Sequence, residues 1–269
     1  MRFSTRSWTF SMPGSALRFI VSASLAIPPA CLAQTPLPDY AWIGAGVRSR
    51  PAYDGSASRK AELIPSVRYY GKPWFARTTQ GLLEGGARVE LAPGLNLGAQ
   101  LAYEGGRAKS ESGFLRDHGV PEISPGASAG LHMEWDHRLG PMPVTLLARG
   151  RQNLDRDRGA QADLRFTGIF FGGGRATAAA FVQGTWGSQK SNQTFYGVDP
   201  AQSAGLSAFS AGSGPLFVGA GLLGGFELGR EWLLLWGLEA RRLRGDAARS
   251  PLAERASSVY ASAGVAYRF

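Results

Sequence analysis

Residues 123–138 read ISPGASAGLHMEWDHR, and apolar and polar side chains alternate along most of this stretch. The small and apolar members share one face: Ala127, Ala129, Leu131, Met133 and Trp135. The polar members share the other: Ser124, Ser128, His132, Glu134 and Asp136. Successive side chains point to opposite faces in a strand, whereas a helix repeats every 3.6 residues. The stretch therefore predicts a β-strand with one apolar and one polar face.

The same pattern recurs along the chain in segments of about ten residues, as on both sides of the turn at Pro93-Gly94. It predicts twelve strands: 40–48, 61–70, 74–80, 84–92, 94–104, 123–138, 142–155, 159–170, 175–188, 216–229, 232–244 and 257–269. The segment 74–80 is the weakest of them, so ten strands is the alternative.

The connections between these strands alternate in length. Long ones are expected at 49–60, 105–122, 189–215 and 245–256, although two on the same side, near 81–83 and 156–158, are short. A soluble sandwich has no reason to alternate in this way, whereas an outer-membrane barrel has short periplasmic turns and longer outer loops. We therefore expect an all-β, antiparallel, up-and-down transmembrane barrel, which must close because lipid offers no partner to an open edge.

Composition agrees with this fold. Glycine supplies 37 of 269 residues, about twice the usual ~7% share, and a curved barrel wall uses small residues and tight bends. Charged residues make up only 18% of the chain, as expected of a wall with one face in lipid. The net charge of +9 is spread over the strands and not clustered, which argues against nucleic-acid binding. A single cysteine excludes a disulfide scaffold and a zinc ribbon.

The N-terminus resembles a secretory signal peptide. Residues 1–33 contain three arginines, no acidic residue, and the short apolar stretch Phe19–Ile27. We expect cleavage after Ala33, with lipidation of Cys31 as the less favoured alternative, and a mature barrel over 34–269. Removing three arginines leaves 26 basic against 20 acidic residues, or +6. No apolar run after residue 33 approaches the ~20 residues of a transmembrane helix.

The inward face is expected to carry a row of charged and polar side chains. Its candidate members are His132, Glu134, Asp136, Arg149, Arg151 and Arg165. The arginines form a positive patch that favours anions, or they pair with Asp163, Glu134 or Asp136, and pairing is the favoured interpretation. An acid–base cluster is the less favoured interpretation of the His132 row. No G-x-S-x-G nucleophile elbow and no convincing metal spacing accompany the three histidines. We therefore expect neither an enzyme nor a metal or cofactor.

The last strand has an apolar face that ends in an aromatic residue. Tyr267 and Phe269 close the alternating run from Ser257 to the end of the chain. This run resembles the recognition strand that the barrel-assembly machinery reads in outer-membrane proteins. It implies the cell outer membrane as location, with outer-membrane lipid and that machinery as partners.

Two loop segments extend the argument: YGVDPAQSAGL at 196–206 and RLRGDAARSPL at 242–252. Together with PAYDGS at 51–56, Gly106-Arg107 and the terminal AYRF, they resemble the MipA/OmpV family of outer-membrane proteins over about residues 40–269. The family pattern has no agreed active site, so no catalytic residue is carried over. The motif positions carry over as loop-structure residues: Tyr196, Gly197, Pro200, Gln202, Ser203, Gly245, Asp246, Ser250 and Pro251.

The resemblance implies a scaffold that links a lytic transglycosylase and a penicillin-binding peptidoglycan synthase to the outer membrane. A porin-like channel for small hydrophilic solutes is the alternative, and an outer-membrane hydrolase comes third. The predicted topology places both motif segments on the outer side, away from periplasmic partners. We therefore expect the 27-residue loop at 189–215 to fold inward as a plug, because a loop of this length without a purpose is unusual.

Overall fold

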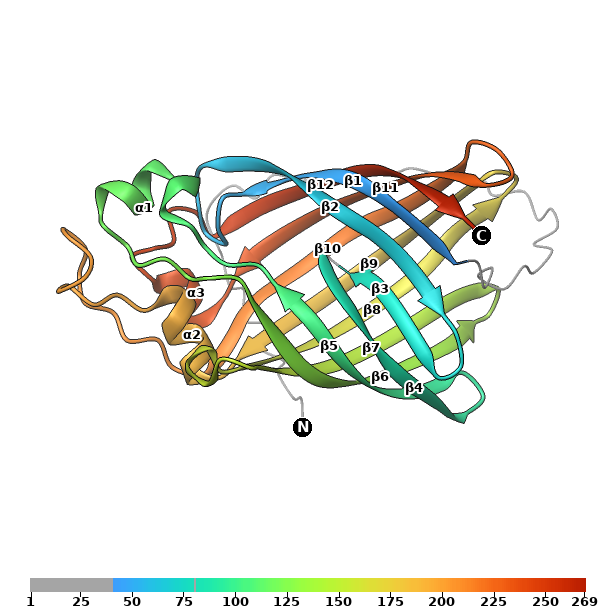
Figure 1. Ribbon diagram of the computed structural model, residues 1–269, viewed down its shortest axis with the longest axis horizontal. Coiled ribbons are helices and arrows are strands. Elements are labelled where there is room, and N and C mark those ends of the chain that lie inside the picture. The colour runs from blue at the N-terminus through green and yellow to red at the C-terminus, as the bar shows by residue number, and fades with distance from the viewer. Residues whose placement is uncertain (1–40, 80) are drawn as a thin grey trace, which may run out of the picture. The chain divides into compact units, whose positions relative to one another are not determined.

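The computed structural model describes residues 41–79 and 81–269, so the predicted signal peptide lies outside the described residues. Twelve antiparallel strands form a closed barrel, which confirms the predicted fold and excludes the ten-stranded alternative (Figure 1). The strands are β1 Trp42–Pro51, β2 Arg59–Tyr70, β3 Trp74–Thr79, β4 Leu82–Ala92, β5 Leu95–Glu104, β6 Gly126–Leu139, β7 Met142–Asn153, β8 Ala160–Gly173, β9 Ala176–Gly187, β10 Gly214–Glu227, β11 Trp232–Leu243 and β12 Ser257–Arg268.

Each strand pairs with its neighbours in sequence, and the barrel closes where β1 meets β12. Trp42 at the start of β1 lies opposite Arg268 at the end of β12. The two ends of the barrel sequence therefore meet at one end of the barrel. The short turns of the β-hairpins, such as Pro93-Gly94, lie at this same end, which the topology of outer-membrane barrels makes periplasmic.

The longer connections gather at the opposite, extracellular end and carry short helices (Figure 1). These are η1 Lys109–Glu111, α1 Gly113–Asp117, η2 Arg156–Arg158, α2 Gln189–Tyr196 and α3 Gly245–Arg249. The strand pattern alone did not predict them. Within residues 41–79 and 81–269, no helix has the length and apolar character needed to cross a membrane.

The strand faces are those that alternation predicts. Leu101, Leu131 and Trp135 point outward and are exposed, whereas Gln100, His132 and Glu134 on the same strands point inward and are buried. An outer wall of exposed apolar side chains suits lipid, and an inner wall of polar side chains suits an aqueous or internally paired lumen.

The wall is continuous except at one seam. Between β2 and β3, only residues 68–70 pair with residues 75–77, so the outer half of β2 has no partner strand on that side among the described residues. The amides of Gly71 and Val67 point across this seam, to the carbonyl oxygen of Trp74 (2.8 Å) and the hydroxyl of Thr78 (3.3 Å). Amides two residues apart in a strand point the same way, so the nitrogen of Pro65 faces the unpaired edge. Proline has no N–H to leave without a partner there, which suits it to an open edge.

Candidate functional site

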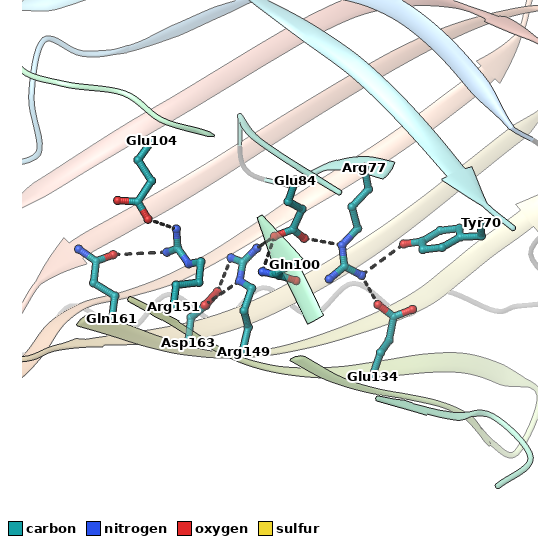
Figure 2. A network of polar contacts seen from close by, with 10 residues as sticks. All are labelled: Tyr70, Arg77, Glu84, Gln100, Glu104, Glu134, Arg149, Arg151, Gln161 and Asp163. Carbon is teal, nitrogen blue, oxygen red and sulfur yellow. Dashed lines mark hydrogen bonds and ion pairs between the residues drawn. The ribbon is translucent and has the colours of Figure 1, made fainter. Parts of the chain in front are cut away.

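A chain of buried ion pairs crosses the lumen between β3 and β8 (Figure 2). Glu84 on β4 accepts hydrogen bonds from Arg77 on β3 and from Arg149 on β7, the latter at 2.6 Å. Arg149 also binds Asp163 on β8 through two nitrogens, at 2.9 and 2.5 Å. The side chains of Glu84 and Arg149 are 0% and 1% exposed. Each of these four buried charges is therefore paired, as burial of a charge requires.

The chain of ion pairs continues towards both ends of the barrel. Towards the periplasm, Arg77 also binds Glu134 on β6, and Arg88 lies 3.7 Å from the same carboxylate. Towards the outside, Arg151 binds Glu104 on β5 at 2.8 Å. Four guanidinium groups thus face four carboxylates: Glu84, Glu104, Glu134 and Asp163. The charges of these eight groups therefore balance, and their side chains occupy this half of the lumen.

A second cluster lies on β11 and β12 and extends to a loop. Arg241 on β11 binds Glu239 at 3.0 Å and lies 3.3 Å from a carboxylate oxygen of Asp54 in the β1–β2 loop. Tyr260 on β12 donates its hydroxyl hydrogen to Asp54. Gln183 on β9 donates to Glu239 at 2.9 Å. The second cluster therefore ties an outer loop to the inner wall.

The predicted polar row lies in the lumen, and only some of its members have the expected partners. Arg149 binds Asp163, as predicted, whereas Glu134 binds Arg77 and not a predicted arginine. Arg151 binds Glu104 instead of Asp163, Glu134 or Asp136. With their charges matched in this way, these side chains do not form the positive patch considered as an alternative.

The remaining members of the row make no ion pair within the described part of the chain. Arg165 lies over the ring of Phe181, 3.7 Å from its centroid. Asp136 accepts a hydrogen bond from Thr145 at 2.6 Å. His132 is 2% exposed and packs edge-on against Phe75, with ring centroids 4.9 Å apart. The His132 ring is therefore enclosed within the inner wall.

The extracellular loops pack together over the mouth of the barrel. One apolar cluster contains Tyr53, Leu115, Val198 and Leu252, which come from four different loops. A second joins Tyr196 and Ala211 to Phe217 and Leu243 on the inner wall and to Ala247 of α3. We call these packed loops, residues 52–58, 105–125, 188–213 and 244–256, the cap. The segment 189–215 therefore belongs to the cap at the mouth (Figure 1), and its side chain Tyr196 reaches the inner wall.

Hydrogen bonds join the two family-like loop segments within the cap. Ser250 donates to the carbonyl oxygen of Tyr196 at 2.6 Å. Asp246 accepts from the amide of Gly212 at 2.7 Å, and this bond, with Arg249 beside it, holds the pKa of Asp246 below its ordinary value. Gly245 has φ +52°, a left-handed conformation that favours glycine. The motif is therefore a pair of interlocked loops.

Other motif residues have different roles. Gly197 has φ −68°, so its small size and not a left-handed backbone is required, because a Cβ there would lie 2.5 Å from the carbonyl oxygen of Gln193. Ser203 is buried, whereas Pro200 and Gln202 lie in an exposed turn and Pro251 follows Ser250 at the end of α3. At the end of β12, Tyr267 packs edge-on against Trp232 at 5.4 Å, and Phe269 is 68% exposed on the outer face.

Arg77 and Glu84 are central to the first cluster, and neither was a candidate site residue from the sequence. Glu84 lies on the polar face predicted for β4, next to Arg88 and Glu90. Arg77 lies on the short strand β3, where Phe75 and Arg77 alternate with small residues. Alternation along β3 was the available signal for Arg77, but a strand of six residues is too short for the pattern to stand out.

Similarity to known proteins adds a family and a fold. The family model described as "MltA-interacting protein MipA" matches residues 43–269. No curated protein matches the chain. Among solved structures, the NanC porin covers 85% of this chain and 100% of its own, at 11% identity and a TM-score of 0.47. LpxR from Salmonella typhimurium covers 85% and 100%, at 10% identity and a TM-score of 0.42. Both likenesses are too distant to support an argument about function.

Proposed function

Because the chain belongs to the MltA-interacting protein MipA family, we propose that this outer-membrane barrel is a closed scaffold that binds a lytic transglycosylase on its periplasmic side. The proposal extends to a peptidoglycan synthase brought to the same place. The observation that carries it is the filled lumen, where Glu84 and Arg149 are almost fully buried in matched ion pairs. We infer that such a barrel offers binding surfaces to partners and does not conduct solutes.

Inward side chains are buried on strands from β3 to β12, which supports a closed state. They include Arg77, Gln100, Arg149, Asp163, Gln183, Phe217, Glu239 and Tyr260. The cap adds a second layer at the extracellular mouth. We also propose that the barrel catalyses no reaction itself, since the one histidine on the inner wall row, His132, is enclosed by Phe75 and the charged cluster.

The periplasmic rim offers a charged surface despite its short turns. Lys72, Arg138, Arg175 and Arg230 are exposed at four different turns, and none has an ion-pair partner among the described residues. Because they surround one end of the barrel, a partner with an acidic surface gains several attractions at once. We propose that this basic rim is where the transglycosylase binds.

A binding experiment tests the rim. The full-length barrel in detergent is used to capture purified MltA, alongside a variant with Lys72, Arg138, Arg175 and Arg230 each changed to Glu. We expect at least about tenfold weaker capture, because rim charges of the wrong sign repel the partner. The matched control carries Lys109, Arg116, Arg156 and Lys190 changed to Glu on the extracellular side, and it should bind as the parent does. Equal capture by both variants would contradict the proposal.

Conductance in a planar bilayer tests the closed lumen. We expect no discrete open steps from the parent barrel at moderate voltage, because the charged cluster fills the lumen. Discrete steps would instead favour a porin-like channel for small hydrophilic solutes, and that outcome would overturn the closed scaffold.

A further inference from the structure

The outer wall of the barrel is hollowed near its extracellular end. A cavity of about 560 Å³ lies across the outer ends of β10, β11 and β12 and the end of the β1–β2 loop. Its floor consists of small or branched apolar side chains: Val218, Ala220, Ala240 and Val259. These positions alternate with the inward residues Arg241 and Tyr260, so the cavity opens on the lipid-facing side.

Five arginines line this cavity, and among the described residues no acidic residue does. One is Arg241, which is bound to Glu239 and Asp54 on the inner wall. The four that belong to the outer wall and the loops are Arg59, Arg242, Arg244 and Arg255. Arg59 is held in place, with one nitrogen bonded to the carbonyl oxygen of Val259 and another to the hydroxyl of Ser49, both at 2.9 Å. Glu254, next to Arg255, directs its carboxylate to Tyr53, Ser56 and the amide of Ala57. Among the described residues, no carboxylate is thus directed into the cavity.

Three of the cavity arginines, Arg242, Arg244 and Arg255, are exposed. Within the described residues their side chains make no ion pair or hydrogen bond. This contrasts with the inner wall, where Arg77, Arg149 and Arg241 are each bound to carboxylates. Carboxylates therefore neutralise these arginines of the inner wall, whereas a positive cluster remains on the outer wall. Cations on the outer wall of a membrane barrel are unfavourable unless they reach the interface.

The arginine cluster lies at the depth expected for the headgroup region of the outer leaflet. Leu238 lies four residues before Arg242 on β11, or about 13 Å along the strand, and it is an exposed apolar residue of the lipid-facing wall. Arg244 and Arg255 lie beyond the strand ends, next to the cap. The arginines are thus placed where lipid headgroups begin on the extracellular side.

We propose that this cavity binds a phosphorylated lipid of the outer leaflet, with the phosphate on the arginines and an acyl chain on the apolar floor. The planar guanidinium fork matches two phosphate oxygens, so it is the side chain best suited to hold this group. The small residues Ala220 and Ala240 leave space beside the wall for a chain to lie along the strands. The site belongs to the outer surface and is separate from the periplasmic rim.

Equilibrium binding of diphosphoryl lipid A to the purified full-length barrel in detergent tests the site. Arg242, Arg244 and Arg255 are changed together to Ala, and Arg59 is retained because it bonds the wall. We expect at least about tenfold weaker binding of diphosphoryl lipid A. The dephosphorylated lipid should bind the parent weakly and the variant no differently. A control with Lys109, Arg116 and Arg156 changed to Ala should stay within about twofold of the parent.

Heat-dependent gel mobility reports whether each variant is a folded barrel, and Arg→Gln at the same three positions replaces the alanine variant if that one fails to fold. Three results would overturn the proposal. The first is that the triple variant binds diphosphoryl lipid A as tightly as the parent, and the second is that the parent binds both lipid forms equally. Alternatively, inorganic phosphate binds the arginines as tightly as the lipid does, which would make this a site for soluble anions.

Discussion

The two halves of the lumen use charge differently. On the β3–β8 side, ion pairs run from strand to strand, with Glu84 and Arg149 binding each other and partners on two other strands, β3 and β8. On the β9–β12 side, Arg241 and Tyr260 direct their polar groups to Asp54, which belongs to a loop of the cap. The first half holds the wall together, and the second holds the cap on the wall. The difference predicts that equivalent substitutions in the two halves have different consequences.

The largest effect is expected from Glu84→Gln. Two buried guanidinium groups, Arg77 and Arg149, share this carboxylate. The substitution removes the negative charge that both of them pair with. Breaking a buried ion pair typically costs about 3–5 kcal/mol of unfolding free energy. The urea midpoint of the barrel refolded in lipid vesicles measures it. Glu90→Gln, at an exposed position near a periplasmic turn, is the control, and a similar midpoint for both variants would contradict the distinction.

A smaller and more local effect is expected from Asp54→Asn. The carboxylate binds Arg241 and Tyr260, so its loss should loosen the cap by about 1–3 kcal/mol and leave the strands paired. Limited proteolysis should then cut within residues 188–213 or 244–256 faster than in the parent, while heat-dependent gel mobility stays unchanged. Asp157→Asn on η2, where the Asp157 side chain is 95% exposed, controls for general loop effects. Unchanged cleavage of the cap would refute the role of Asp54.

Arg165→Met is expected to cost still less, about 1 kcal/mol. Arg165 lies on the inner wall between the two clusters, but it packs on Phe181 without an ion pair to a carboxylate. Methionine retains the contact with the ring and loses only the cation–π attraction. The same urea midpoint measures the change. A loss as large as that of Glu84→Gln would show that the two clusters act as one unit.

The smallest effect is expected from mild acid. Burial raises the pKa of Asp54, but Arg241 and the Tyr260 hydroxyl outweigh it and hold the pKa below its ordinary value. The ion pair is therefore fully formed above the unfolded pKa of about 3.9 and weakens only as the pH falls through the lower folded value. Cap cleavage by an acid-tolerant protease should be the same at pH 7 and pH 5 once normalised to a denatured substrate, and should rise below pH 4. A rise between pH 7 and pH 5 would contradict this assignment.

Alternation predicted the barrel, its twelve strands and the face of each side chain, because a period of two is a local property of the sequence. It did not predict the ion-pair partners. Arg77 and Glu134 are 57 residues apart, and Glu84 and Arg149 are 65 apart, so their meeting depends on the register of every strand between them and on closure. The sequence predicted that the loop at 189–215 folds inward as a plug, but not that four loops pack together as a cap at the mouth. The bonds from Ser250 to Tyr196 and from Gly212 to Asp246 join separate loops. No local pattern encodes such contacts.

The open edge of β2 has a consequence for how the wall responds to force. β8 and β9 pair along nearly their whole length, from Gln161 to Gly173, whereas β2 and β3 pair over residues 68–70 alone. Lateral tension in the bilayer loads every ladder of the wall, and the shortest ladder has the fewest hydrogen bonds to resist it. The barrel should therefore part between β2 and β3, with Pro65 on the torn edge, while β1 and β2 stay joined to β12. Under membrane stretch, the barrel would thus open each time at the same place, between β2 and β3.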